Sequence, residues 1–294
     1  MDRRRARLGA QVGVGATLSL ARGIKQSIVG EVRATFNDRT KGETPVTRRP
    51  DGLFGPRSVA WRVHGDVTSM MVGGMAALLL QMLYPAVLAG VWDHSNFRAD
   101  MIGRLRRTAR FIALTTYGGR DEAEAAIERV RAIHHQVRGT LGDGTPYSAD
   151  EPRLLAWVHV TEVLSFLDSW RRYGEPAMSL AEQDRYVDEV ARVGEALGAD
   201  PLPRSRAEAE RLMQAMRGDL RADARSREVA RLVLNTAVTT PAARLFRSLT
   251  SQAAVDLLPD WARDMHGLSD PLLLRPLVRA GTYGVASTIR WAFR

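Results

Sequence analysis

Apolar residues recur along this chain at steps of three and four, the spacing that places them on one face of an α-helix. A sustained alternation of apolar and polar residues, which would indicate half-buried strands, is not found. The pattern therefore predicts an all-α fold built as a single multi-helix domain. We expect an N-terminal helix and loop at 1–50, the main helical domain at 51–270, and a C-terminal helix at 271–294 that packs on the core or on a membrane surface.

The longest apolar stretch runs from Val67 to Trp92 and contains no charged residue. A stretch of about 20 such residues is long enough to cross a bilayer, so membrane insertion is one interpretation. A glycine pair, Gln81 and Pro85 interrupt the stretch, and proline kinks or ends a helix because it lacks an amide donor. We therefore favour a buried core helix that is broken near Pro85.

A predicted helix at 100–116 carries polar groups within its apolar face. Steps of four and three place Arg104, Thr108 and Phe111 on one side of this helix, with Arg107 at its border. A buried cation is costly unless it has a partner. This face is therefore a candidate for chemistry.

The next predicted helix spans 120–138 and has an inward histidine. His134 lies in phase with the apolar residues of this helix, whereas His135 lies out of phase. A histidine on an apolar face is more often a core residue than a metal ligand, so both interpretations stay open for His134.

A longer predicted helix at 152–173 places His159 and Glu162 on one face. If this helix and the preceding one are antiparallel neighbours, His159 and His134 can reach a common cavity. Glu162 can also serve only as an acceptor for the imidazole. The pairing of Glu with a following His that di-iron bundles repeat on two helices is absent.

Composition narrows the classes of function. The formal net charge is +9 and the pI near 10.6, but the arginines are scattered among acidic residues and no basic block alternates with aromatics. We therefore expect no nucleic-acid partner, and a cytoplasmic protein that can contact anionic lipid peripherally. Without cysteine, the chain has no disulfide, thiolate nucleophile or thiolate-ligated haem, so a metal must be held by histidine or oxygen donors.

Four segments occur in order along the chain, namely QMLYPAVLAGVWDHSNFRADMIGRLRRT, RVRAIHHQVRGT, GTPYSADEPRLLAWVHVTEVLSFLDSWRRYG and LLPDWARDMHGL. Together they resemble the MpaB-type oxygenase family, which includes the latex clearing proteins that cleave rubber. The resemblance covers roughly Leu53 to Leu268. It implies an all-α fold with a globin-like core and a b-type haem that activates dioxygen.

The resemblance also implies roles for particular residues. The family's proximal histidine lies in a His-x-x-Val-Arg pattern that matches His134, Val137 and Arg138. His134 is thus the expected axial ligand and Arg138 part of the haem site. His159 is expected beside the haem as a partner or as the alternative axial ligand, and Glu162 as a group near it.

On the distal side, the family's Arg-x-x-Lys-Thr motif matches Arg104, Arg107 and Thr108. The lysine of this motif is arginine here, and a guanidinium is too basic to deprotonate and bind iron. The distal side is therefore expected to be open, water-filled or guarded by a cation. The catalytic glutamate of the rubber-cleaving members has no counterpart in the uncharged run at 85–92.

These observations predict a haem-b-dependent oxygenase that acts with dioxygen on an apolar, isoprenoid or lipid-like substrate, by insertion or cleavage. The alternative is a helical scaffold or membrane-associated protein that keeps the fold without a cofactor.

Overall fold

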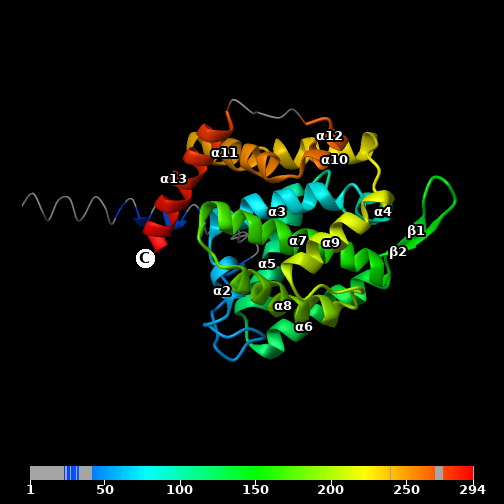
Figure 1. Cartoon of the computed structure of the whole chain (residues 1–294), viewed down its shortest axis with the longest axis horizontal. Coiled ribbons are helices and arrows are strands. Elements are labelled where there is room, and N and C mark those ends of the chain that lie inside the picture. The colour runs from blue at the N-terminus through cyan, green and yellow to red at the C-terminus, as the bar shows by residue number, and fades with distance from the viewer. Residues whose placement is uncertain are drawn as a thin grey trace, which may run out of the picture. The chain divides into compact units, whose positions relative to one another are not determined.

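The computed structural model describes residues 42–238, 240–268 and 274–293, with scattered positions between 23 and 32 (Figure 1). The predicted first helix therefore lies largely outside the described residues. The chain divides into a large unit, Val46–Ala286, and a second unit formed by Met1–Pro45 and Ser287–Arg294. The described elements are helical apart from one short hairpin, which confirms the prediction of a helical fold. In chain order they are α2 (Val59–Val63), α3 (Val67–Gln81), α4 (Pro85–His94), α5 (Met101–Tyr117), α6 (Arg120–His134), β1 (Arg138–Thr140), β2 (Pro146–Ser148), α7 (Pro152–Tyr173), α8 (Leu180–Leu197), α9 (Arg206–Ala215), η2 (Arg217–Asp219), α10 (Ala224–Leu234), α11 (Pro241–Leu257), α12 (Asp260–His266) and α13 (Arg275–Phe293).

The long apolar stretch forms two helices, α3 and α4, as the proline within it predicts. The Asp66 carboxylate caps α3 by accepting a hydrogen bond from the Ser69 amide at 2.7 Å. Pro85 is the first residue of α4, and the two helices meet at an angle of 105°. Within the described ranges, no single helix has the length and hydropathy to cross a bilayer, and only the bent α3–α4 pair passes that test together. The prediction of a buried helix broken near Pro85 is confirmed.

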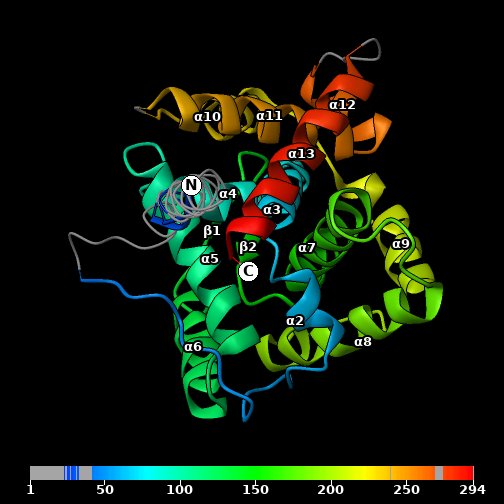
Figure 2. The same cartoon turned by 90° about the vertical axis from the view of Figure 1, so that its left-hand side faces the viewer.

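The centre of the larger unit is the pair α3 and α7, with α11 packed on α3 (Figures 1 and 2). Gly73 allows the close approach of the pair, because a Cβ there would lie 2.8 Å from both Phe166 Cδ1 and Ser165 O. Apolar side chains from both helices are buried along their length and form the core. The predicted bounds of α7 are confirmed.

Helices α5 and α6 form an antiparallel pair joined by Gly118 and Gly119 (Figure 2). The Asp100 side chain caps α5 by accepting from the Gly103 amide at 2.8 Å, at the predicted start of this helix. Helix α6 packs mainly against α5 and α8, so the prediction that α6 and α7 are antiparallel neighbours is wrong.

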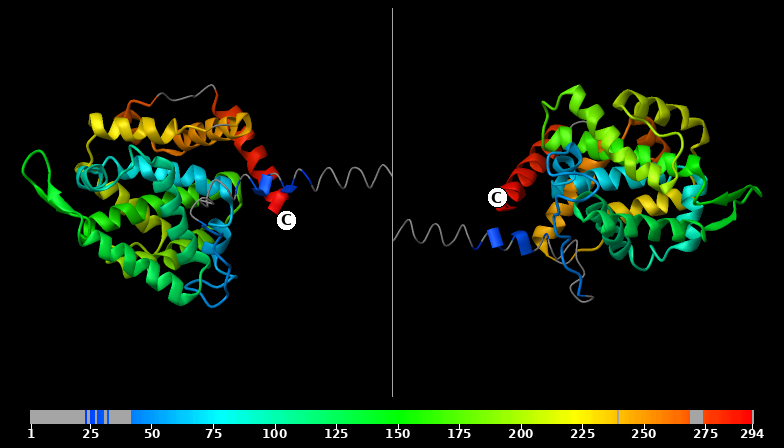
Figure 3. Two further views of the ribbon diagram at one scale, coloured as in Figure 1. Left: turned by 180° about the vertical axis from the view of Figure 1, so that it is seen from behind. Right: turned by 90° about the horizontal axis from the view of Figure 1, so that it is seen from below.

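The predicted end of α6 at residue 138 is wrong, because the helix stops at His134 and the chain turns into the β1–β2 hairpin. The two strands pair antiparallel, with Gly139 opposite Tyr147. A Cβ on Gly139 would lie 2.6 Å from the Tyr147 hydroxyl oxygen, so the strand needs glycine there to cover the buried ring. Figure 3 shows the hairpin projecting from the helices.

Helix α8 closes the interior on the side away from α11 (Figure 1). A capping box starts it, since Ser179 accepts from the Glu182 amide at 3.3 Å and the Glu182 carboxylate accepts from the Ser179 amide at 3.3 Å. Gly198 ends it with a φ of +92°, a conformation that glycine adopts without strain. Helix α9 then returns to pack on α7.

Candidate functional site

In the structure, Arg104 of α5 and Glu162 of α7 lie close enough for the charge of each to shift the pKa of the other. Burial lowers the pKa of Arg104, as does the nearby charge of Arg107, while Glu162 opposes the shift. Burial raises the pKa of the Glu162 carboxyl to about 7, opposed by a hydrogen bond from Gln81 and by Arg104. Glu162 is therefore the acidic group whose charge acts on the partly buried Arg104, although no ion pair joins the two side chains among the described contacts.

Gln81 joins α3 to this pair. Its amide nitrogen lies 3.5 Å from Glu162 Oε1 and 3.5 Å from the Val158 carbonyl oxygen, so each hydrogen bond is long. The sequence indicates this contact, because Gln81 is a polar amide residue within a long apolar stretch and needs a hydrogen-bond partner there. We interpreted it as an interruption of the helix and did not assign it to the site.

A further polar cluster, which the sequence did not reveal, includes Tyr186, a residue that the charge of Glu162 affects. His64, at the end of α2, lies 2.8 Å from Thr116 Oγ1 through Nδ1 and 2.8 Å from the Tyr186 hydroxyl through Nε2. Burial lowers the pKa of His64 to about 4, so this imidazole is neutral at neutral pH. Burial raises the pKa of Tyr186 well above its ordinary value, and the charge of Glu162 adds to the shift.

His134 is the last residue of α6 and is half-buried. Burial lowers the pKa of its imidazole, with Asp150 opposing and His135 adding to the shift, so the ring is neutral at neutral pH. Its Nδ1 is buried and has no hydrogen-bond partner, whereas its Nε2 is not among the buried atoms that lack a partner. The neighbouring His135 is exposed and pairs with Asp150 at 2.6 Å, as expected for a residue out of phase with the core.

His134 and Arg104 lie at the same end of the α5–α6 pair. Arg104 stands 14 residues before Gly118, and His134 stands 15 residues after Gly119. At about 1.5 Å per residue, both are therefore roughly 20 Å from the turn that joins the helices. This end of the pair presents a neutral imidazole and a partly buried guanidinium.

His159 of α7 is in a different setting. Burial lowers the pKa of its imidazole to about 4, and the charge of Arg204 adds to the shift. The ring packs on α8, because a Cβ on Gly194 would lie 3.0 Å from His159 Nδ1. Its Nε2 is enclosed and has no hydrogen-bond partner. An iron ligand needs an accessible nitrogen, so His134 fits this role better than His159.

The remaining residues of the expected site lie nearer the surface. Arg107 is exposed and contacts Asp100 at 3.4 Å, and Thr108 is exposed with its hydroxyl 3.3 Å from the Arg104 carbonyl oxygen. Arg138 does not lie on α6 one turn beyond His134, because α6 has already ended. Its guanidinium is exposed and contacts Asp150 at 3.3 Å.

Helix α5 is buried at its two ends and only half-buried across its middle. Met101 and the segment 115–117 are buried, while apolar residues between them, including Leu105, Phe111 and Ile112, keep part of their surface accessible. Apolar side chains of a core helix are usually covered along one face. The middle of α5 therefore offers an apolar wall near Arg104 that the protein itself does not fully cover.

The chemistry of these groups limits which cofactors they can hold. Across the described residues, no cluster of three or more histidine or acidic side chains has the arrangement of a metal site. A haem needs only one or two protein ligands to its iron. The neutral imidazole of His134 with its accessible Nε2 fits an axial ligand, and Arg104 fits the counter-charge of a propionate.

Comparison with known proteins identifies the family. A sequence model of the ER-bound oxygenase mpaB/B'/rubber oxygenase catalytic domain matches residues 61–291. The chain belongs to this family. The resemblance found in the four segments is thereby confirmed. The match contains every candidate residue described above.

Among curated proteins, two uncharacterized mycobacterial proteins are similar to this family member. One is from Mycobacterium bovis and one from Mycobacterium tuberculosis, and each is 27% identical over 126 residues. The alignments cover 42% of this chain and 49% of each relative, so the chain spans about half the length of the relatives that it matches. No solved structure matches the chain.

Proposed function

We propose that this member of the family is a haem-b-dependent oxygenase that acts on an apolar substrate with dioxygen. The family supplies the class of reaction. The observation that carries the cofactor assignment is the state of His134, a neutral imidazole at the end of α6 with Nδ1 enclosed and Nε2 accessible. A globin-like core, which the family resemblance implies, is part of the same proposal.

In this proposal His134 binds the haem iron through Nε2. The burial that lowers its pKa keeps the nitrogen unprotonated and able to bind at neutral pH. Arg104 pairs with a propionate or steadies a negatively charged group beside the haem. The bound haem supplies the activation of dioxygen.

Arg107 and Thr108 occupy the next turn of α5, at the border of the proposed site. A guanidinium is too basic to bind iron, so the proposed role of Arg107 is electrostatic. The Thr108 hydroxyl donates a hydrogen bond to the Arg104 carbonyl oxygen at 3.3 Å. A rotation of the side chain would free this hydroxyl to donate to a bound ligand instead. Arg138, through its contact with Asp150, stabilises the hairpin that follows His134.

Glu162 is the proposed proton donor and acceptor of the interior. A pKa near 7 lets this carboxyl hold or release a proton at neutral pH, whereas an ordinary glutamate is already ionised. Gln81 and Arg104 stabilise the ionised form, and burial stabilises the protonated form. His159, whose Nε2 is enclosed, packs beside the site and positions α7 against α8.

The substrate is proposed to be apolar, either isoprenoid or lipid-like. The half-buried apolar side chains in the middle of α5 are suited to such a molecule, because covering them removes apolar surface from water. The net charge of +9 supports a peripheral contact with anionic lipid as the place where the substrate is met. A cytoplasmic location with such contact is part of the proposal.

A haem titration tests the proposal. The full chain, produced with a haem supply, is expected to purify with a Soret absorption band and to bind haem in equal molar amount. His134→Ala should lose the band. His135→Ala is the matched control, because it removes the adjacent exposed imidazole, and it should keep the band. Retention by His134→Ala together with loss by His159→Ala would assign the ligand to α7 and overturn the choice of His134.

One observation favours the alternative of a helical scaffold without a cofactor. A histidine that binds a metal usually donates its other ring N–H to an acceptor, and His134 Nδ1 has none. If the full chain shows no Soret band after haem is added in excess, the scaffold interpretation replaces the haem proposal.

A further inference from the structure

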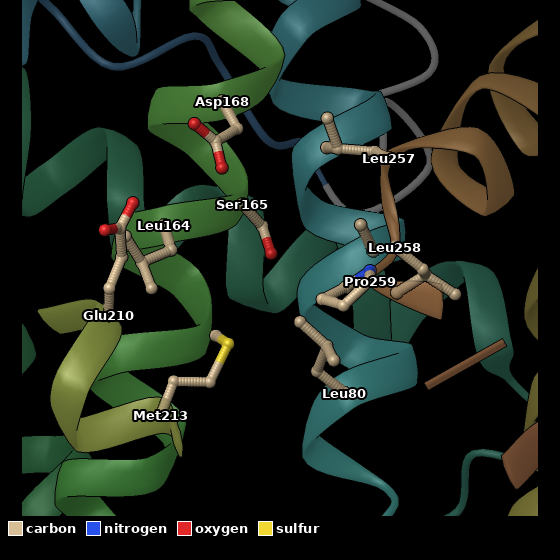
Figure 4. A pocket seen from close by; sticks show the side chains of 10 residues that line it. Leu80, Leu164, Ser165, Asp168, Glu210, Met213, Leu257, Leu258 and Pro259 are labelled. Atoms are coloured by element: carbon tan, nitrogen blue, oxygen red, sulfur yellow. The ribbon is translucent and has the colours of Figure 1, made fainter. Parts of the chain in front are cut away.

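A cavity of about 200 Å³ lies between α3, α7, α9 and the junction of α11 and α12 (Figure 4). Its position separates it from the candidate site. Ser165 and Asp168 of α7 line it, whereas His159 and Glu162 project from another face of the same helix. At about 100° per residue, Asp168 lies about 120° around the helix from Glu162 and about 180° from His159, while Ser165 lies at the border, about 60° from Glu162. The cavity is therefore a separate feature of the fold, and none of the candidate site residues lines it.

The inner walls of the cavity are apolar. Ala76 and Leu80, four residues apart on α3, form one side, and Leu164 of α7 also lines the cavity. Met213 of α9 and Leu258 also line the space, which is open to solvent on one side. All of these except Met213 are buried. An engineered apolar cavity of about 150 Å³ holds benzene, so this volume has room for a six-membered ring and a short substituent.

One side of the cavity is polar. Figure 4 shows the Ser165 hydroxyl directed from α7 toward the cavity. No hydrogen bond of this hydroxyl occurs among the described contacts, and its oxygen is not enclosed by protein. Asp168 lies one turn further along the same face. The pair offers a hydroxyl and a carboxylate to the same small region.

The charges at this end are balanced. Arg206 contacts Asp168 Oδ1 at 2.7 Å and Glu210 Oε1 at 2.8 Å, and Arg171 contacts Asp168 Oδ1 at 3.3 Å. Two arginines thus neutralise the two carboxylates that line the cavity. Both contacts to Asp168 fall on Oδ1, which leaves Oδ2 able to accept a hydrogen bond. A site of this kind has no net charge to attract an ion, and its carboxylates disfavour an anion.

We propose that this cavity binds a small uncharged alcohol with an apolar ring or short chain. Its hydroxyl donates a hydrogen bond to Asp168 Oδ2 and accepts one from Ser165 Oγ, which suits a group that is both donor and acceptor. Its apolar part fills the space among Ala76, Leu80 and Met213. The proposal does not depend on haem, since none of the candidate site residues lines the cavity.

Three ligands of matched shape test this assignment: benzyl alcohol, benzylamine and benzoate. Calorimetric titration of the full chain is expected to give binding for benzyl alcohol, and binding at least about tenfold weaker for benzylamine and benzoate, which introduce an uncompensated charge. Benzyl alcohol should also raise the melting temperature in proportion to occupancy. Equal or tighter binding of either charged ligand, or no binding of benzyl alcohol, would overturn the proposal.

Variants locate the bound alcohol. Ser165→Ala should weaken benzyl alcohol about five- to tenfold, the effect of one hydrogen bond, and leave toluene unchanged because toluene lacks the hydroxyl. Ser169→Ala is the matched control: Ser169 lies one turn away on α7 with its hydroxyl enclosed and does not line the cavity. Ala76→Leu should abolish binding of both ligands by filling the space.

A further variant separates this proposal from the haem assignment. His134→Ala should leave the affinity for benzyl alcohol unchanged, whether or not it removes a Soret band. If instead His134→Ala abolishes binding and Ser165→Ala does not, the alcohol occupies the interior beside α5, and the assignment to the α3–α7–α9 cavity is wrong.

Discussion

The imidazole of His64 and the hydroxyl of Tyr186 lie 2.8 Å apart in the interior and join α2 to α8. The other ring nitrogen of His64 lies 2.8 Å from Thr116 Oγ1, so both nitrogens are satisfied and α5 is included in the same network. Three helices that enclose the candidate site are thus connected through one neutral imidazole.

Tyr186→Phe should lower the free energy of unfolding by about 1–3 kcal/mol. The substitution keeps the ring in the core but leaves His64 Nε2 buried without a partner, and that desolvation cost is not recovered. Urea denaturation followed by circular dichroism measures the change. A variant as stable as the natural chain would mean that this hydrogen bond contributes nothing to the packing of α8.

Stability should depend on pH through groups that act in opposite directions. The pKa values of His64 and His159 are lowered by burial to about 4, so between the ordinary value near 6.5 and about 4 the unfolded chain binds the extra protons. Their effect is that stability falls as the pH falls through this window. The pKa of Glu162 is raised to about 7, so between about pH 4.5 and 7 the folded chain binds the extra proton. The stability that protonated Glu162 contributes is therefore lost as the pH rises through this window.

Glu162→Gln separates the two effects. Without the glutamate, stability should rise more steeply between about pH 4.5 and 7, and the variant should gain stability relative to the natural chain as the pH rises. Denaturation midpoints at several pH values give the slopes. Parallel pH profiles for the two proteins would show that the Glu162 carboxyl titrates at its ordinary value.

The two glycines of α3 should respond differently to alanine. At Gly73 a Cβ would lie 2.8 Å from Phe166 Cδ1, so Gly73→Ala forces α3 and α7 apart and should cost about 1–3 kcal/mol. At Gly74 the closest described atom is Phe166 Cε1 at 3.6 Å, an ordinary contact. Gly74→Ala should therefore be neutral or stabilise by up to about 1 kcal/mol, since alanine favours the helix. Equal effects at both positions would contradict the close packing of this pair.

Asp256 links three helices by a buried ion pair. Its side chain is fully enclosed, and it accepts from Arg172 of α7 at 2.8 Å and from Arg279 of α13 at 2.8 and 3.0 Å. Asp256→Asn leaves these guanidinium groups without their charged partner and should cost about 3 kcal/mol. The exposed pair of Arg49 and Asp51 provides a control, and Asp51→Asn should leave the melting temperature unchanged. Similar melting temperatures for both variants would contradict a structural role for Asp256.

Local sequence signals were sufficient for much of the helical fold. Asp100 before an apolar face, Pro152 at a helix start and Pro85 within an apolar stretch each mark a boundary that the structure contains. The end of α6 was missed because it depends on a contact outside the helix, between the two strands of the following hairpin. Gly139 must approach the Tyr147 ring, and helical periodicity contains no information about that pairing.

The candidate site was less predictable, because its parts come from helices far apart in sequence. Phase along α5 and α7 identified Arg104 and Glu162, and the structure brings them together. The positions of His64 and Tyr186 on their own helices gave no reason to include them in the site, because their contact arises from the packing of α2 against α8. It also grouped Thr108 with Arg104, although the shift from interior to surface along α5 leaves Thr108 exposed. The family's signature residues lie in this region, and their functional assignment comes from the resemblance.

The most direct test of the haem proposal is to remove the imidazole of His134 and supply it again from solution. His134→Gly, loaded with haem, should lose the absorption spectrum of the natural holoprotein, and added imidazole should restore that spectrum by occupying the space that the side chain leaves. His159→Gly should keep the spectrum without added imidazole. A His134→Gly protein with an unaltered haem spectrum, or one that imidazole does not change, would contradict the assignment of His134 as the ligand.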